Sequence, residues 1–198
     1  GNPSHRAGSR EYVDVMEGPA ERTDAQVVRD VLDGDRDSFR ILVRRYGDVL
    51  YGHAYRMVED PDEAADLVQR AFVRGFKKLS SARDPDRIGA WLFRILSNLA
   101  RDHLKSPRRM GVSLDRVGEI PEGGSDPLES AHLEEVRARL QLAMGELTPE
   151  QREAFTLKHV EGRSYEEIAA VLDLSVGSLK MRVHRAREVL RELLEEYR

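Results

Sequence analysis

Apolar residues along this chain recur at intervals of three and four, not two. That spacing places them on one side of a helix, whereas strict alternation indicates a strand. Helix-start signals precede these segments: Thr23, Thr148 and Ser164 each stand three residues before a Gln or Glu, as in a capping box, and Asp60 precedes Pro61. No convincing alternating segment occurs, so the sequence predicts an all-α fold.

The predicted helices form two groups, separated by a stretch rich in proline and glycine that interrupts any helical pattern. From Asp115 to Glu135 this stretch carries seven acidic residues and one basic residue, a net charge of −6. We therefore predict two small helical domains joined by an acidic extended linker. The predicted organisation is a flexible N-terminal tail at 1–22, a first domain at 23–106, the linker at 107–132 and a second domain at 133–198.

The composition narrows the class of protein. Of the 198 residues, 34% are charged and 40% apolar, with a net charge of −4. No uncharged apolar run approaches membrane-spanning length and no secretory signal is visible, so a cytoplasmic protein without membrane insertion is expected. The absence of cysteine excludes disulfides, thiolate zinc sites and cysteine nucleophiles. Scattered histidines and the lack of a phosphate-binding glycine loop predict no enzyme, no catalytic residue, no metal and no cofactor.

The sharpest pattern lies near the C-terminus. A short helix capped by Ser164 is followed by a turn at Asp173–Ser175, and then by a helix whose apolar stripe, from Val176 to Leu193, has spacings of 3, 4, 3, 4 and 3. This is a helix-turn-helix, whose second helix can enter the DNA major groove. Between Ser175 and Arg191, five basic residues and one acid give a local charge of +4. A basic helix in an acidic chain favours DNA binding over a merely solvated face.

A second basic helix is predicted from about Ile88 to Lys105. Its buried stripe comprises Ile88, Trp91, Leu92, Ile95, Leu96 and Leu99. On another side fall Arg94, Asn98, Arg101 and Lys105. Asparagine can pair with base edges while arginine and lysine hold phosphates. Two basic helices on opposite sides of an acidic linker predict two separate nucleic-acid contacts.

A third feature is polar. The helix predicted from about Asp60 to Leu79 carries Asp66, Gln69 and Arg70 beside its apolar stripe. The helix dipole accounts for the acidic residues of its first turn, but not for the pair Asp66 and Gln69. A protein partner is one interpretation that spacing alone leaves open.

Taken in order, these segments resemble a bacterial sigma factor. The motifs Gly34-Asp35 with Phe39, Leu42-Val43 and Arg45-Tyr46, then Asp66-Leu-Val-Gln69, then Trp91-Leu-Phe-Arg94-Ile95 with Asn98, resemble the sigma-two domain. The motifs Leu147-Thr-Pro-Glu-Gln-Arg152, Gly162-Arg-Ser-Tyr-Glu-Glu-Ile-Ala169, Ser175-Val-Gly-Ser-Leu-Lys180 and Arg185-Ala-Arg187 resemble the sigma-four domain. The compact form is similar to the extracytoplasmic-function (ECF) group.

The resemblance implies a role for each surface. Polymerase-binding residues would be Asp66, Gln69 and Arg70, the last standing where many members have an acid. The start-proximal promoter element would contact Arg94, Asn98, Arg101 and Lys105, with the Ser80–Arg87 loop completing a pocket for a flipped base. The upstream promoter element would contact Lys158, Ser178, Lys180, Met181, Arg182, His184, Arg185 and Arg187. The implied partners are core RNA polymerase, promoter DNA and an anti-sigma factor.

An alternative function remains on the sequence alone. A stand-alone helix-turn-helix regulator would bind duplex DNA without polymerase, using only the C-terminal domain. Such a regulator needs neither the Asp66 and Gln69 face nor the Asn98 pocket, so the first domain distinguishes the two hypotheses.

Overall fold

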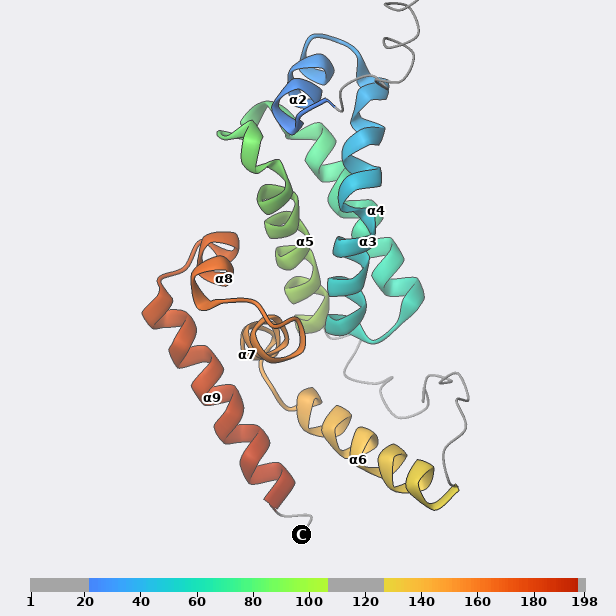
Figure 1. The fold of residues 1–198 in the computed structure, drawn as a ribbon, viewed down its shortest axis with the longest axis vertical. Coiled ribbons are helices and arrows are strands. Elements are labelled where there is room, and N and C mark those ends of the chain that lie inside the picture. The colour runs from blue at the N-terminus through green and yellow to red at the C-terminus, as the bar shows by residue number, and fades with distance from the viewer. Residues whose placement is uncertain (1–21, 107–126, 196–198) are drawn as a thin grey trace, which may run out of the picture.

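The computed structural model describes residues 22–106 and 127–195, and residues 127–133 by their backbone alone. Within these ranges there are helices and no strands, as predicted (Figure 1). The first half contains α2 (Asp24–Leu32), α3 (Phe39–Val58), α4 (Pro61–Lys77) and α5 (Ile88–Lys105), with short 3-10 turns at Arg36–Ser38, Leu79–Ser81 and Pro85–Arg87. The second half contains α6 (Pro127–Gly145), α7 (Pro149–Phe155), a π-helical turn (Thr156–Val160), α8 (Tyr165–Leu172) and α9 (Val176–Glu195).

The predicted domain boundaries are only partly within the described residues. Of the predicted tail, residues 1–21 lie outside them, as do residues 107–126 of the predicted linker. The last part of the predicted linker, 127–132, is helical rather than extended, because α6 begins at Pro127. Proline is tolerated at the first helical position, and no further proline or glycine interrupts the chain until Gly145.

The predicted helix starts are confirmed. The hydroxyls of Thr23, Thr148 and Ser164 each accept a backbone N–H three residues ahead, at 3.1–3.2 Å, and the Gln or Glu side chain there accepts the cap N–H in return. Asp60 accepts the N–H groups of Asp62 and Glu63 at 3.0 and 3.1 Å. Each cap satisfies amides that the helix itself cannot pair.

In the first half, α3, α4 and α5 pack around an apolar core and α2 crosses one end (Figure 1). Phe39 meets the rings of Phe72 and Phe76 edge-on. Helices α4 and α5 approach closely at Gly75, where an added Cβ would lie 2.6 Å from a methyl of Leu92. Trp91 and Ile95, predicted as core, are only half-buried.

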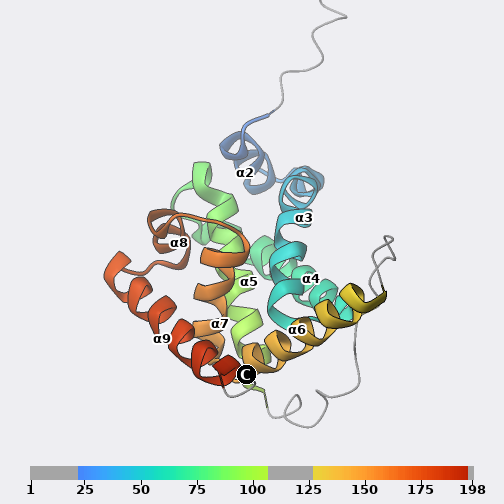
Figure 2. The same cartoon turned by 60° about the horizontal axis from the view of Figure 1, so that its bottom comes forward.

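The two halves pack against each other rather than standing apart across a tether. Helices α7 and α8 lie beside α5 in both views (Figures 1 and 2). One continuous apolar cluster includes core residues of the first half together with Leu157 and Ile168 of the second. Two helical halves are present as predicted, but the hydrophobic pattern identified their buried faces without indicating that the halves contact each other.

Candidate nucleic-acid interfaces

The turn between α8 and α9 sets the direction of α9, the second helix of the predicted helix-turn-helix. Asp173 adopts a left-handed conformation (φ 60°), which aspartate tolerates better than most residues. Ser175 then caps α9 by accepting the N–H of Ser178 at 3.1 Å. Because Leu179 and Val183 face the core, the opposite side of α9 faces outward. The predicted upstream-element residues that are exposed there are Ser178, Lys180, Met181, His184, Arg185 and Arg187.

The remaining two predicted upstream contacts are more enclosed. Arg182 is half-buried, and its Nη1 has no hydrogen-bond partner among the described residues. Lys158, in the π-helical turn, donates to the Arg163 carbonyl at 3.2 Å and lies 4.6 Å from the centre of the Tyr165 ring. Lys180 lies 5.6 Å from the same ring. Tyr165 thus gathers two cations from different elements, a contact that no spacing in the sequence indicated.

The polar residues of α5 share one side of the helix as predicted, and the second half of the chain covers much of it. We call Arg94, Asn98, Arg101 and Lys105 the α5 basic face. Arg94 donates to the carbonyls of Val171 and Ala170 at 3.1 and 3.4 Å. Arg101 pairs with Glu153 at 3.1 Å and also donates to Asn98. Every cation of this face therefore has a partner in the second half, the last being Lys105, 2.5 Å from Glu150.

A cavity of about 510 Å³ opens beside Asn98. The predicted loop, Ser80–Arg87, contributes only Ser81 to it. Helix α4 and the residue after it supply two cations that sequence reasoning missed, Arg74 and Lys78. Trp91 and Ile95 pack against the core and also line this cavity, which explains why they are only half-buried. Arg94 and the carboxylate of Asp102 complete the lining. The apolar wall suits a base, and the three cations outnumber the single acid where its phosphates would lie.

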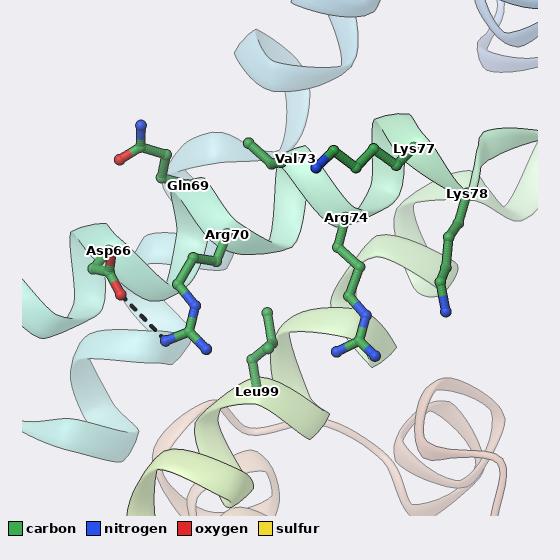
Figure 3. A pocket seen from close by; sticks show the side chains of 8 residues that line it. All are labelled: Asp66, Gln69, Arg70, Val73, Arg74, Lys77, Lys78 and Leu99. Atoms are coloured by element: carbon green, nitrogen blue, oxygen red, sulfur yellow. Dashed lines mark hydrogen bonds and ion pairs between the residues drawn. The ribbon is translucent and has the colours of Figure 1, made fainter.

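The predicted protein-docking residues line a neighbouring groove of about 570 Å³ between α4 and α5, shown in Figure 3. Asp66 and Arg70 form an ion pair at 3.3 Å, and each side chain is about half exposed. Gln69 points away from this pair (Figure 3). The groove continues over Val73 and Leu99 to the cations Arg74, Lys77 and Lys78. Exposed ion pairs contribute little to stability, so breaking this one would cost little free energy.

A buried charged cluster lies between the halves, and sequence reasoning missed it. His53 of α3 is fully buried, with Nδ1 2.7 Å from Glu161 and Nε2 3.8 Å from Glu153. Glu161 also pairs with Arg56 at 3.2 Å and Arg163 at 3.1 Å. We call these residues, with Arg101 on Glu153, the His53 cluster. One signal was available, because His53 stands between Leu50 and Met57 on the buried stripe of α3.

The charged groups of the His53 cluster shift the pKa values of His53 and Glu161. Burial acts to lower the pKa of His53, but the carboxylates of Glu153 and Glu161 outweigh burial and raise it above the ordinary value. Burial likewise acts to raise the pKa of Glu161, but His53, Arg56 and Arg163 lower it to about 2. The cluster therefore favours an imidazolium held by two carboxylates.

Two further observations bear on the chemistry. No group of three or more acidic or histidine side chains that could hold a metal occurs in the part of the chain that the structure describes. None of the described helices combines the length and apolarity needed to cross a bilayer.

Comparison with known proteins identifies two family regions in the chain. Residues 42–110 match the family described as Sigma-70 region 2, and residues 137–190 match Sigma-70, region 4. The first range contains the docking groove and the α5 basic face, and the second contains the helix-turn-helix.

The chain is also similar to individual relatives over most of its length. The RNA polymerase sigma-H factor of Pseudomonas aeruginosa is 34% identical over 181 residues, covering 87% of this chain and 94% of the relative. The ECF RNA polymerase sigma-E factor of Escherichia coli K12 is 34% identical over 177 residues, covering 85% and 92%. Among solved structures, the sigma factor RpoE of Bartonella quintana, in complex with the anti-sigma factor NepR, has a TM-score of 0.55 at 30% identity, covering 81% and 98%.

Proposed function

The chain belongs to the ECF family of RNA polymerase sigma factors, and from that premise we propose which of its surfaces performs each step of promoter-directed initiation. As an alternative sigma factor, it directs core polymerase to promoters. The observation that carries this function is that both sigma regions lie in one chain, in order. We assign the chain no catalytic step, because nucleotide addition belongs to the polymerase, and we propose that it acts in the cytoplasm, where polymerase and DNA are found.

Helix α9 is proposed to read the upstream promoter element as duplex DNA. Its exposed face carries Ser178, Met181 and His184 at the centre, and Arg185 can pair with a guanine edge. Lys158, Lys180, Arg182 and Arg187 are proposed to hold phosphates, which fix the register of the helix in the groove. Tyr165 keeps Lys158 and Lys180 in place for this task.

The α5 basic face is proposed to bind the start-proximal element after its strands separate. A base must leave the stack before its edges can be read by a pocket. The cavity beside Asn98, with the Trp91 ring on its wall, offers an amide for the base edge and an aromatic surface for stacking. Arg94, Arg101 and Lys105 would hold the phosphates on either side, once the second half no longer pairs with them.

The groove at Asp66, Gln69 and Arg70 is proposed as a polymerase contact. Its half-exposed ion pair and the outward Gln69 can exchange their present contacts for those of a protein surface. An anti-sigma factor is a second proposed partner, supported by the complex formed by the Bartonella quintana relative. A stand-alone regulator is not favoured, because such a protein has no use for region 2.

Transcription from genomic DNA by core polymerase with and without this chain, with sequencing of transcript 5′ ends, tests the assignment. We expect a set of start sites that appears only with the chain. The double variant Asp66→Ala, Gln69→Ala should lose co-elution with core polymerase, whereas Asp48→Ala, exposed on α3, should retain it. Equal co-elution of both variants would reject the docking groove.

Asn98→Ala tests the melted-strand pocket separately. We expect normal co-elution with polymerase but about tenfold fewer open complexes, because losing a good base contact costs roughly 1–3 kcal/mol. Permanganate reactivity of unpaired thymines at one of the mapped start sites measures the open fraction. Unchanged reactivity would remove Asn98 from the proposed site.

A further inference from the structure

The interface between the two halves covers the surface that melted DNA would need. Arg94, Arg101 and Lys105 of the α5 basic face each pair with groups on α7 or α8. Glu150 and Glu153 occupy positions beside these cations where, by charge, DNA phosphates would lie. The exposed face of α9, in contrast, is turned away from this interface and remains free.

The interface between the two halves is closely packed and contains buried, hydrogen-bonded side chains. Ser97 of α5 is fully buried and donates to Glu153, which is also fully buried. Arg152 of α7 is buried and donates to the carbonyl of Met57 at 2.9 Å. At its centre the imidazole of His53 lies near the ring of Phe93, with ring centres 4.5 Å apart. The buried Ser97, Glu153 and Arg152 have hydrogen-bond partners, which favours a single arrangement of the halves, whereas Nε2 of His53 has none among the described residues and faces Glu153 only as an ion pair at 3.8 Å.

We propose that in the free chain the second half packs over the α5 basic face and masks it, an arrangement we call the closed state. The imidazolium of His53, between Glu153 and Glu161, stabilises this state, and we call it the latch. This inference rests on the proposed role of the α5 basic face in promoter binding. Losing the latch proton leaves two carboxylates around a neutral ring in a buried site, and the halves separate.

The charges around His53 determine the sign of the pH effect. Glu153 on α7 and Glu161 after the π-helical turn are negative, whereas Arg56 on α3, Arg163 before α8 and Arg101 on α5 are positive. The carboxylates lie 2.7 and 3.8 Å from the ring nitrogens, and they raise the pKa of His53 in the closed state against the effect of burial. Closure is therefore fully favoured below the ordinary histidine pKa, and this contribution is lost as the pH rises through the raised value.

A buried thiol reports the opening directly. The chain has no cysteine, so Ser97→Cys places one thiol in the interface. Ser80→Cys, exposed on the first half, calibrates thiol reactivity at each pH, and Ala71→Cys, buried inside the first half, reports unfolding. We expect iodoacetamide to modify Ser97→Cys slowly near pH 6, and protection relative to Ser80→Cys to fall severalfold toward pH 9, because the raised pKa of His53 is passed as the pH rises.

The latch variant is His53→Gln, which keeps a polar group but cannot carry the charge. Combined with Ser97→Cys, it should protect the interface thiol near pH 6 no better than the chain with His53 does near pH 9, and protection should show little pH dependence. Combined with Ala71→Cys, it should leave the core thiol protected. Equal protection of the interface thiol with and without His53 overturns the latch. If the core thiol also reacts, the variant has unfolded, and Glu161→Gln, measured in the same way, decides the question.

A second measurement leaves Ser97 intact. Spin labels on Arg40→Cys and Glu192→Cys, both exposed and on opposite halves, should give one distance near pH 6 and an added longer one near pH 9. A broad distribution at every pH would overturn the closed state. Neither measurement uses polymerase or DNA, so closure is judged apart from the proposed function. Failure of the proposed function would be seen in the transcription experiment instead, as the absence of start sites that depend on this chain.

Discussion

At the scale of single residues, the charged groups buried between the halves should contribute more to the free energy of unfolding than those on the surface. Removing one partner from a buried pair leaves the other charge unsatisfied, which costs several kcal/mol, whereas an exposed pair contributes little. Glu161 is 7% exposed and meets three cationic or protonatable groups, while the pair Asp66 and Arg70 is about half exposed. Substitution of Glu161 should therefore change the free energy of unfolding, whereas substitution of Asp66 should change binding to core polymerase.

The pKa of Glu161 predicts acid sensitivity of the fold. Its folded value of about 2 lies below the ordinary 4.5, so its stabilising contribution is present above pH 4.5 and is lost as the pH falls toward 2. We expect the free energy of unfolding, from urea titrations, to fall by about 2–3 kcal/mol over this window through Glu161. Glu161→Gln should be less stable at neutral pH and lack that part of the acid dependence. An unchanged acid profile in the variant would contradict this assignment.

Part of the residue-level picture was available from the sequence. Asn98, Arg101 and the exposed side of α9 follow from helical spacing, which fixes directions around an axis. The partners of Arg101 and His53 are Glu153 and Glu161, far along the chain, and spacing within one helix carries no information about them. Arg74 and Lys78 were missed for the same reason, since they reach the Asn98 cavity from a different part of the chain.

At the scale of elements, the spacing between α4 and α5 shapes both the docking groove and the Asn98 cavity. Gly75 lets the two helices approach, with Leu92 filling the space a side chain would take. The helix starts were predictable because capping boxes act locally. The π-helical turn after α7 was not predicted, because no local signal of spacing or capping in the sequence marks such a turn.

Gly75→Ala tests this spacing. The added methyl would meet Leu92 at 2.6 Å, and we expect a loss of about 1–3 kcal/mol in the free energy of unfolding from overpacking, together with weaker polymerase co-elution. Gly47→Ala is the matched control, because it lies within α3 with nothing within 4 Å of the added carbon. It should be neutral or stabilising by about 0.5–1 kcal/mol. A larger loss at Gly47 than at Gly75 would reject the packing argument.

Recognition by α9 predicts a distinct pattern of salt dependence. Replacing Arg187 by Ala should weaken holoenzyme binding to all promoters and lower the salt slope by about one, as expected for a phosphate contact. Arg185→Ala should alter the preference among mapped promoters instead. Filter binding across a salt series, with Arg29→Ala on α2 as control, separates the two effects. Identical slopes for Arg187→Ala and the control would remove its phosphate contact.

At the scale of the whole molecule, both predicted helical domains are present, and they pack against each other, which the sequence did not indicate. Each half alone has a small core, and small domains bury a smaller fraction of their surface. Packing α7 and α8 against α5 adds apolar burial and pairs the basic face with acids. The negative charge of residues 115–135 marked this stretch as a linker, but it could not indicate how the segments on either side would meet.

Connection between the halves matters for activity because both promoter elements must be held at once. A linked second half is present at an effective concentration on the order of millimolar. We expect a protease site inserted between residues 115 and 116, once cut, to abolish run-off transcription at nanomolar sigma concentrations, and the uncut insertion to be active. Equal activity of cut and uncut protein after separation by dilution would contradict this.

The outward orientation of α9 beside the covered α5 has a consequence for the order of events at a promoter. In the proposed closed state, α9 would contact duplex DNA while the α5 basic face stays covered. We therefore expect recruitment to precede unwinding, and a wrong site to be released before any base enters the cavity beside Asn98.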